Sequence, residues 1–427
     1  MKRPILYLLF LSFSSVLFAQ TRDLNFYLDQ AINNSPLIHK NTNENEIVSL
    51  DMKQVKSILS KPVISIEGNI LFAPIVSHDN NSNHFEWVSD GATDYNGYDM
   101  ASTDGGQYQA GISITQPLFN GSVFRTYSNK AGISQEINEN NIALTVHELE
   151  QLVGYQYILC LKAKTQAQNS LLLLNQINEQ TVIMQKLVEN AIYKQTDLML
   201  LQIEQGNYDA EYKTSQADYR NNLYDLNLIC GINDTALVDI EVINFEINPY
   251  PLTQSKFLKA YKLDSLNLMA DQYIYQQKYK PQLSWFANAG LNAVYIPDYN
   301  RLGFSTGLIF SWTIFDGHQR EIEQQKTRVN LNTLEFEKQN FITQTDLQKQ
   351  KIKNQIQSLE KRVAIVKEQI NQYERLISAY QEELLLGEIS VMDLRLLLND
   401  MSVKKQELLM LEMERLTLIN SYNYWNY

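Results

Sequence analysis

Cysteine has the widest chemistry of the residues in this chain, because its thiol can bind metals, act as a nucleophile or form a disulfide. The two cysteines, Cys160 and Cys230, have no spacing typical of metal ligands. Position 195 lies halfway between them, so two antiparallel helices that meet in a turn there would place both thiols at the same height. The sequence leaves open a disulfide, which an oxidising compartment would favour, or two free thiols.

The other reactive residue types form no catalytic pattern. The five histidines are scattered, and neither a Ser/His/Asp arrangement nor a glycine-rich phosphate loop occurs. We therefore expect no enzyme activity, no cofactor and no metal site. The formal charge of −12, without a basic cluster, argues against nucleic acid as a partner.

An acidic stretch covers residues 75–106 and has no Lys or Arg. Its carboxylates are Asp79, Glu86, Asp90, Asp94, Asp99 and Asp104. These oxygens could bind calcium. A solvated surface loop is the favoured interpretation, because the stretch is polar and highly charged, and the sequence leaves open whether this loop is ordered.

The first residues are typical of an export signal. Lys2 and Arg3 precede an apolar run over residues 5–18, and Ala19 offers a cleavage point, so residues 1–19 are predicted to be a signal peptide. A membrane anchor is the alternative, but the run is shorter than the about 20 residues that a spanning helix needs. No later stretch is apolar enough to span a membrane as a helix. The chain is therefore either a soluble exported protein or one that enters a membrane as strands.

Four segments alternate apolar and polar residues, as strands with one apolar face do. They cover residues 62–74, 107–119, 281–293 and 302–315. Each has about the length that a tilted strand needs to cross a bilayer. The aromatic residues Tyr108, Trp285, Phe304 and Trp312 would then face lipid or its interfaces. A soluble sandwich is the alternative, which the export signal and the surrounding helices make less favourable.

The strands come in two pairs that repeat along the chain. Each pair begins at a Lys-Pro step, at Pro62 and Pro281, because proline ends a helix and favours extended structure before it. Helices are expected before these prolines, over residues 23–61 and 253–280. A long helix follows each pair, then a turn and a returning helix. The predicted long helices cover 120–190 and 316–386, the turns 191–197 and 387–393, and the returning helices 198–230 and 394–425.

This order indicates an internal tandem duplication. Repeat 1 covers residues 20–235, and repeat 2 covers residues 236–427, which begin with a linker. Asp197 and Asp393 are 196 positions apart, as are the glycines that follow each strand pair, Gly121 and Gly317. Pro62 and Pro281 are 219 positions apart, and the extra residues of repeat 1 belong to the loop at 75–106.

The second long helix carries a heptad repeat. Ten apolar residues alternate in steps of four and three: Ile352, Ile356, Leu359, Val363, Val366, Ile370, Tyr373, Ile377, Tyr380 and Leu384. This 3.5-residue period is the signature of helices that pack knobs into holes. We predict that the long helices form coiled-coil-like rods.

Together these features resemble the TolC family of outer-membrane efflux proteins. The resemblance rests on the signal peptide, the paired Lys-Pro strand openings, the strand exits "QPLFNG" and "IFDG", the second turn "LLLGEISVMDLRLLLND" and the ending "INSYNYWN". It implies a membrane α+β fold. Three protomers would each give four strands to a 12-stranded β-barrel, which a long periplasmic helical barrel continues. It also implies a homotrimer in outer-membrane lipid, coupled through a periplasmic adaptor to an inner-membrane transporter of the RND or ABC type.

The resemblance also assigns roles to the turns. Asp393 matches the first position of an acidic ring at the periplasmic aperture, and the second position falls on Leu396. A helix cap is the alternative for Asp393. Asp197 is interpreted as a cap or as a tether between turns, with Arg395 as a conceivable basic partner. The adaptor-docking residues would be Gly387, Ser390, Val391 and Met392, with Lys194 and Thr196 in the first turn. The alternative is plain hairpins with nothing docked.

Three functions follow from these features, in order of preference. The first is a passive exit duct of an efflux or type I secretion system. The second is a structural or adhesive coiled-coil protein of the cell surface, against which the apolar faces of the strands argue. The third is an exported hydrolase, for which the sequence offers no catalytic residues.

Overall fold

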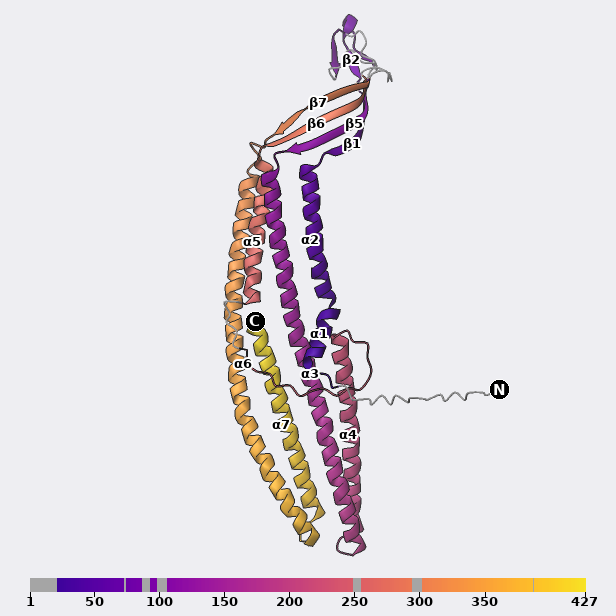
Figure 1. Cartoon of the computed structure of the whole chain (residues 1–427), viewed down its shortest axis with the longest axis vertical. Coiled ribbons are helices and arrows are strands. Elements are labelled where there is room, and N and C mark those ends of the chain that lie inside the picture. Colours follow the sequence, from indigo (N-terminus) through magenta and orange to yellow (C-terminus); the bar gives the residue numbers. More distant parts are fainter. Residues whose placement is uncertain are drawn as a thin grey trace, which may run out of the picture. The chain divides into compact units, whose positions relative to one another are not determined.

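The computed structural model describes residues 21–72, 74–86, 93–97, 106–248, 255–293, 302–386 and 388–427. The chain forms two compact units, shown with their elements in Figure 1. We call Asn41–Asn140 with Ala260–Lys338 the strand unit. We call Met1–Lys40, Asn141–Lys259 and Gln339–Tyr427 the helical unit.

A four-stranded antiparallel sheet dominates the strand unit. Its strands are β1 (Val63–Phe72), β5 (Gly106–Leu118), β6 (Gln282–Ala293) and β7 (Leu302–Ser311), in the order β1-β5-β6-β7. The strand pairs are thus adjacent in one sheet, and β5 joins the two repeats by pairing with β6. Both Pro62 and Pro281 directly precede a strand, as expected from their fixed φ.

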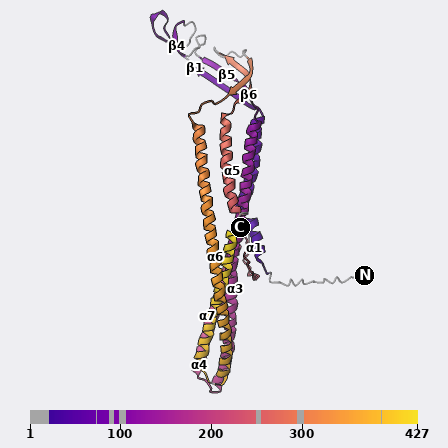
Figure 2. The same ribbon diagram turned by 90° about the vertical axis from the view of Figure 1, so that its left-hand side faces the viewer.

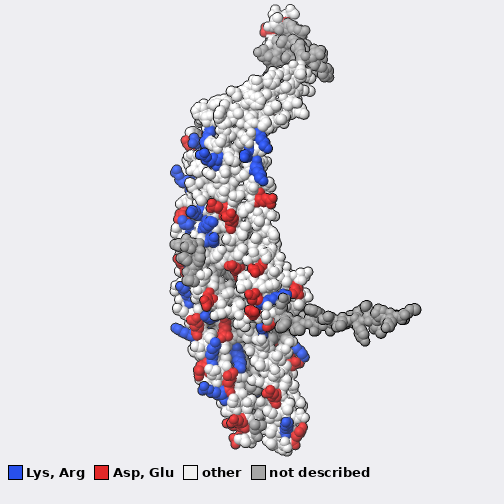
Figure 3. All heavy atoms as spheres, viewed as in Figure 1, with Lys and Arg blue, Asp and Glu red and all other residues white. Residues whose placement is uncertain are grey.

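The registers of the sheet separate an apolar face from a polar one. Ile66, Ile112, Ala289 and Phe304 form one row across the sheet, and Trp285 lies opposite Leu308 on the same face. The other face carries Ser65, Ser113, Asn288 and Ser305, interrupted by Phe286 and Ile309. Ile66 is 87% exposed and Phe304 73% exposed, so no other part of the described chain covers the apolar face there. The face of the strands visible in Figure 3 is uncharged.

The duplication is present in the pairing itself. Val63 pairs with Thr115 in the first repeat, and Gln282 pairs with Ser311 in the second. Val63 and Gln282 are 219 positions apart, and Thr115 and Ser311 are 196 positions apart, which are the two offsets between the repeats in the sequence. Each repeat therefore builds its hairpin in the same register.

The exits from the two hairpins differ. α3 (Gly121–Glu189) begins three residues after β5, whereas α6 (Gln319–Leu386) begins eight residues after β7 ends at Ser311. Gly317 and His318 have φ of 68° and 66°, and the Asp316 carboxylate accepts a hydrogen bond from the Arg320 N–H at 2.9 Å. β7 ends at Ser311, which lies opposite Gln282, the first residue of β6 after Pro281. A proline cannot donate to a strand ladder, so the pairing stops there and β7 is shorter than the expected 302–315.

A second sheet lies in the stretch 75–106, where the sequence left the order of the loop open. In the described part, β2 (Ile75–Ser77) pairs with β3 (His84–Glu86) and β4 (Tyr95–Gly97), and the 3-10 helix η1 covers Asp79–Asn81. Strands of three residues are too short to show alternation in the sequence. Asp90, Asp99 and Asp104 lie outside the described residues.

Asp79 of η1 joins this helix to the residues before β4. Its carboxylate accepts hydrogen bonds from the Thr93 hydroxyl at 2.6 Å, the Thr93 N–H at 2.9 Å and the Asp94 N–H at 3.0 Å. The Thr93 hydroxyl contributes most to lowering the pKa of Asp79. Asp79 thus has an internal structural role. Among the described residues, no group of three or more His, Cys, Asp or Glu could hold a metal ion.

The helices before the strands are shorter than expected. The predicted helix over 23–61 is divided into α1 (Leu24–Asn34) and α2 (Pro36–Ser60), and α5 covers Lys256–Gln276, followed by the 3-10 helix η3 (Gln277–Tyr279). Ser35 takes an extended conformation, with ψ of 116°, because Pro36 disfavours the helical region for the residue before it. In the strand unit, the Lys130 ammonium of α3 pairs with Asp271 of α5 at 2.7 Å.

The helical unit contains two antiparallel hairpins. α4 (Gln195–Ile229) returns along α3, and α7 (Val391–Trp425) returns along α6, as Figure 2 shows for α6 and α7. All ten predicted heptad residues of α6 are buried or partly buried in three apolar clusters. The coiled-coil-like packing is therefore confirmed. Among the described residues, no helix is both long and apolar enough to cross a membrane.

Candidate functional site: the two helical turns

The first turn, between α3 and α4, ends α3 with a Schellman motif. The Ile192 N–H donates to the Leu187 carbonyl and the Ala191 N–H to the Val188 carbonyl, both at 2.9 Å. Ala191 has a φ of 58°, where glycine is the favoured residue. In the second turn the Glu388 N–H donates to the Glu383 carbonyl at 3.1 Å. This bond corresponds to the Ile192–Leu187 bond of the first turn, since both residues are shifted by 196 positions. Gly387 lies outside the described residues.

Both candidate carboxylates cap the returning helices. Asp393 and Ser390 form a capping box: the Ser390 hydroxyl accepts from the Asp393 N–H at 3.2 Å, and the Asp393 carboxylate accepts from the Ser390 N–H at 3.3 Å. The Asp197 carboxylate accepts from the Lys194 N–H at 3.0 Å. The lysine side chain has no acceptor, so the first cap is one-sided. Asp393 is exposed and Asp197 is partly buried.

A tyrosine joins the two turns. The hydroxyl group of Tyr193 lies 2.8 Å from the Ile389 carbonyl oxygen and 3.1 Å from that of Leu384, and it shares its one proton between them. Burial, and to a lesser degree Asp197, raises the pKa of Tyr193. The sequence does not point to this residue, because a tyrosine in a turn gives no signal of its partner. Tyr193 and Ile389 occupy equivalent positions in the two repeats, and this equivalence is the one feature of the sequence that relates them.

Arg395 pairs with a different carboxylate from the one expected. Its Nε lies 3.7 Å from Glu204 Oε2 on α4, and the side chain of Glu204 is largely buried. The expected partner Asp197 instead caps α4. Arg395 and Glu204 therefore connect the two hairpins about one turn into α7 and about two and a half turns into α4.

The docking candidates differ in accessibility. Lys194, Thr196, Ser390 and Met392 are exposed, and Met392 is 41% exposed. Val391 is 3% exposed and lies in the apolar cluster that joins the hairpin tips, together with Leu394, Leu198 and Met184. Val391 is the first residue of α7 and points into this cluster, so its prediction as a surface contact is wrong.

The two cysteines lie in one buried cluster, at the same height as expected, but both are free thiols. The disulfide considered from the sequence is therefore not formed in this structure. Burial raises the pKa of Cys160 and Cys230 to about 12 each, with a smaller contribution from Asp225 at Cys160. The neutral thiols act as small apolar side chains beside Tyr27 and Tyr157.

The sequence matches no protein-family model and no curated protein. Solved structures match it over 94% of the chain, and they define the class of the fold. The chain has the fold of bacterial outer-membrane channels.

Three of these structures illustrate the similarity. The outer membrane protein VceC of Vibrio cholerae is 12% identical, with a TM-score of 0.68 over 94% of this chain and 95% of its own. The CmeC outer membrane channel of Campylobacter jejuni is 12% identical, with a TM-score of 0.66 over 94% of this chain and 85% of its own. The MtrE outer membrane channel of Neisseria gonorrhoeae is 11% identical, with a TM-score of 0.67 over 94% of this chain and 88% of its own.

Proposed function

We propose that this chain is one protomer of an outer-membrane channel that serves as a passive exit duct for efflux or type I secretion. The observation that carries the proposal is the four-stranded sheet. It has an uncovered apolar face, and among the described residues its outer strands β1 and β7 are each paired on one side only. In lipid, each unpaired backbone group costs several kcal/mol, so such a sheet needs further strands at both edges.

Copies of the same chain are the partners we propose for these edges. Each copy supplies four strands, and closure of the sheet removes every open edge. The resemblance to the TolC family favours a homotrimer with 12 strands, and the fold shared with solved outer-membrane channels supports a membrane location for the strands. Residues 1–19 would direct export, the strands would lie in the outer membrane, and the hairpins would extend into the periplasm.

The two turns are the proposed contact with the rest of the export machinery. Lys194, Thr196, Ser390 and Met392 are exposed at the tips and would meet a periplasmic adaptor, which couples the duct to an inner-membrane transporter of the RND or ABC type. Asp393 and Asp197 would line the periplasmic aperture. Each keeps carboxylate acceptors beyond those used in its cap, so a capping role and an aperture role are compatible.

The test is reconstitution of the full-length exported protein. Detergent extraction from outer membranes should yield an oligomer, and its addition to planar lipid bilayers should produce stable ionic conductance. Copurification with a tagged periplasmic adaptor should fail when Met392 and Thr196 are both replaced by Asp. A water-soluble single chain without conductance would overturn the proposal.

A further inference from the structure

Glu67 is the one charged residue in the four strands of the main sheet. The sequences of β1, β5, β6 and β7 contain no other Asp or Glu, and no Lys or Arg. A charged side chain within a membrane-length strand is costly unless it faces water, so its position on the sheet is informative.

The register places Glu67 on the polar face. Glu67 lies opposite Gly111 on β5, and Ser65 and Ser113 belong to the same face. Ile66, the next residue, belongs to the apolar face and lies opposite Ile112. In a closed barrel whose apolar face meets lipid, the Glu67 carboxylate therefore faces the passage.

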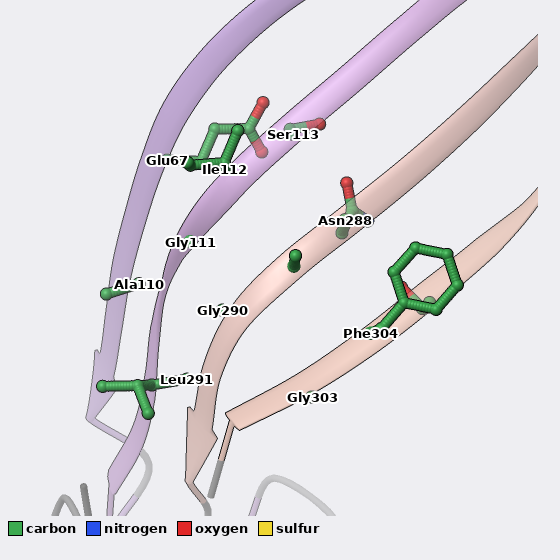
Figure 4. Close-up of a pocket in the computed structure, with 12 residues that line it drawn as sticks. Glu67, Ala110, Gly111, Ile112, Ser113, Asn288, Gly290, Leu291, Gly303 and Phe304 are labelled. Carbon is green, nitrogen blue, oxygen red and sulfur yellow. The ribbon is translucent and has the colours of Figure 1, made fainter.

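The surroundings of Glu67 leave this carboxylate open to the passage. Its row across the sheet continues through Gly111, Gly290 and Gly303, which have no side chains. A Cβ added to Gly290 would come within 2.3 Å of the Gly111 Cα, so the two strands approach each other too closely for larger residues. The row forms the floor of a hollow of about 250 Å³, and Figure 4 shows Glu67, Ser113 and Asn288 projecting from the same side of the sheet.

The polar contact that the structure gives Glu67 is a neutral one. The Ser65 hydroxyl donates to Glu67 Oε1 at 2.9 Å. Because the strands contain no Lys or Arg, no basic side chain of the sheet can neutralise the carboxylate. The negative charge is therefore available to ions in the passage.

We propose that Glu67 is a selectivity residue of the channel, and that one carboxylate per copy forms a ring that favours cations inside the barrel. This inference rests on the proposed function. A ring of like charges in a low-dielectric wall attracts cations and repels anions. It is separate from the turns, since Glu67 lies in the strand unit and Asp393 in the helical unit.

The salt dependence of such a ring follows from screening. The field of a wall charge extends about 30 Å at 0.01 M salt and about 3 Å at 1 M. The cation preference due to Glu67 should therefore be strong in dilute KCl and vanish in concentrated KCl. A preference that arises from pore width alone would not change in this way.

The experiment measures reversal potentials of the reconstituted full-length channel across KCl gradients at low and at high salt. Glu67→Gln should lower the K⁺ over Cl⁻ permeability ratio severalfold at low salt and leave it unchanged at high salt. Glu67→Asp, which keeps the charge, should retain the ratio. Ser65→Ala removes the neutral contact but keeps the carboxylate, and it should also retain the ratio.

A second variant avoids any effect of Glu67→Gln on assembly. Glu67→Cys can be modified in the open channel, where a negatively charged thiol reagent should restore the cation preference and a positively charged one should reverse it. Equal ratios for the native channel and Glu67→Gln, or no response to either reagent, would overturn the role of Glu67 while conductance persists. A native protein without conductance would instead overturn the proposed function.

Discussion

Ala191 holds a left-handed backbone conformation in the first turn, with a φ of 58°. Glycine adopts this conformation without a Cβ clash, and at this point of a Schellman motif it is the usual residue. We predict that Ala191→Gly stabilises the first turn by about 1 kcal/mol, which slows amide hydrogen exchange at Ile192 about fivefold. Hydrogen exchange followed by mass spectrometry measures this effect.

The matched control is Ala217→Gly. Ala217 is exposed in the middle of α4, where glycine costs about 1 kcal/mol relative to alanine. This variant should speed local exchange. If Ala191→Gly and Ala217→Gly both slowed or both sped local amide exchange, the left-handed conformation of Ala191 would not explain the result.

The two buried thiols give a prediction about reactivity and pH. Their pKa values of about 12 leave almost no thiolate at pH 8, so Cys160 and Cys230 should resist maleimide in the native protein. Denaturant without reductant should expose two reactive thiols. Because both pKa values are raised from about 8.5 in the unfolded chain, the neutral thiols stabilise the fold fully below pH 8.5, and this contribution is lost as the pH rises toward 12. Two thiols that stay unreactive after denaturation would instead indicate a disulfide.

Asp393 has two roles to separate, a helix cap and a charge at the proposed aperture. Asp393→Asn removes the charge, whereas Ser390→Ala removes the hydroxyl of the capping box and keeps the charge. We predict that Asp393→Asn lowers the cation preference of reconstituted channels at low salt and that Ser390→Ala does not. The readout is the reversal potential across a KCl gradient. An unchanged potential for Asp393→Asn would leave the residue with its capping role alone.

At the scale of the elements, periodic features could be predicted from the sequence and irregular ones could not. The heptad residues from Ile352 to Leu384 and the alternating strands are long repetitive patterns, so their burial and pairing follow from spacing. The break at Ser35 depends on Pro36, and β7 ends at Ser311 because its partner strand begins at Gln282 after Pro281. The strands β2, β3 and β4 are three residues long, and no local pattern reveals their pairing or the contacts of Asp79 with Thr93 and Asp94.

In the candidate site, too, local contacts could be predicted from the sequence and long-range contacts could not. The capping box of Ser390 and Asp393 and the one-sided cap of Asp197 follow from short local spacings, which the sequence shows. The Tyr193 bonds and the Arg395–Glu204 pair join residues far apart in the sequence, and only the packing of the hairpins brings them together. Val391 was misassigned because the turn motif alone does not say which side of a helix start faces the partner hairpin.

The duplication predicts how the edges of two copies pair. Ile112 of β5 pairs with Ala289 of β6 between the repeats. The repeat relates β5 to β7 by an offset of 196 and β1 to β6 by an offset of 219, so Ile112 corresponds to Leu308 and Ala289 corresponds to Ile70. The same pairing between copies would place Leu308 of β7 opposite Ile70 of β1 in the next copy, with both on the apolar face. We predict that Leu308→Cys with Ile70→Cys cross-links between copies through a short bis-maleimide.

Register controls use the same edge. Leu308→Cys with Ile66→Cys places the thiols four residues apart along the strands, about 13 Å at the rise of a strand, so this pair should cross-link poorly. If the true register between the copies differed from the predicted one by an odd number of residues, the residue opposite Leu308 would lie on the polar face. Stronger cross-linking of the Ile66 pair would show that the two edges do not follow the internal repeat.

At the scale of the whole molecule, the proposal depends on closure. A heterologous contact between β7 of one copy and β1 of the next generates a ring if the rotation closes and a filament if it does not. Edges that match as the internal repeat predicts would favour a ring. The apolar face of the four strands carries no charged residue that would exclude lipid, and the face of the strands visible in Figure 3 is uncharged.

The number of copies in the ring can be read from the cross-linked channel. If three copies close the barrel, the Leu308→Cys and Ile70→Cys chain should give bands of one, two and three chains on a denaturing gel, and complete reaction should convert all material to the three-chain band. The single variants and the native chain, whose two thiols are buried, should stay monomeric on the gel. A ladder that ends at two chains would indicate an eight-stranded barrel. One that continues beyond three would indicate a larger ring or an open assembly, because a closed trimer has no free edge left to react.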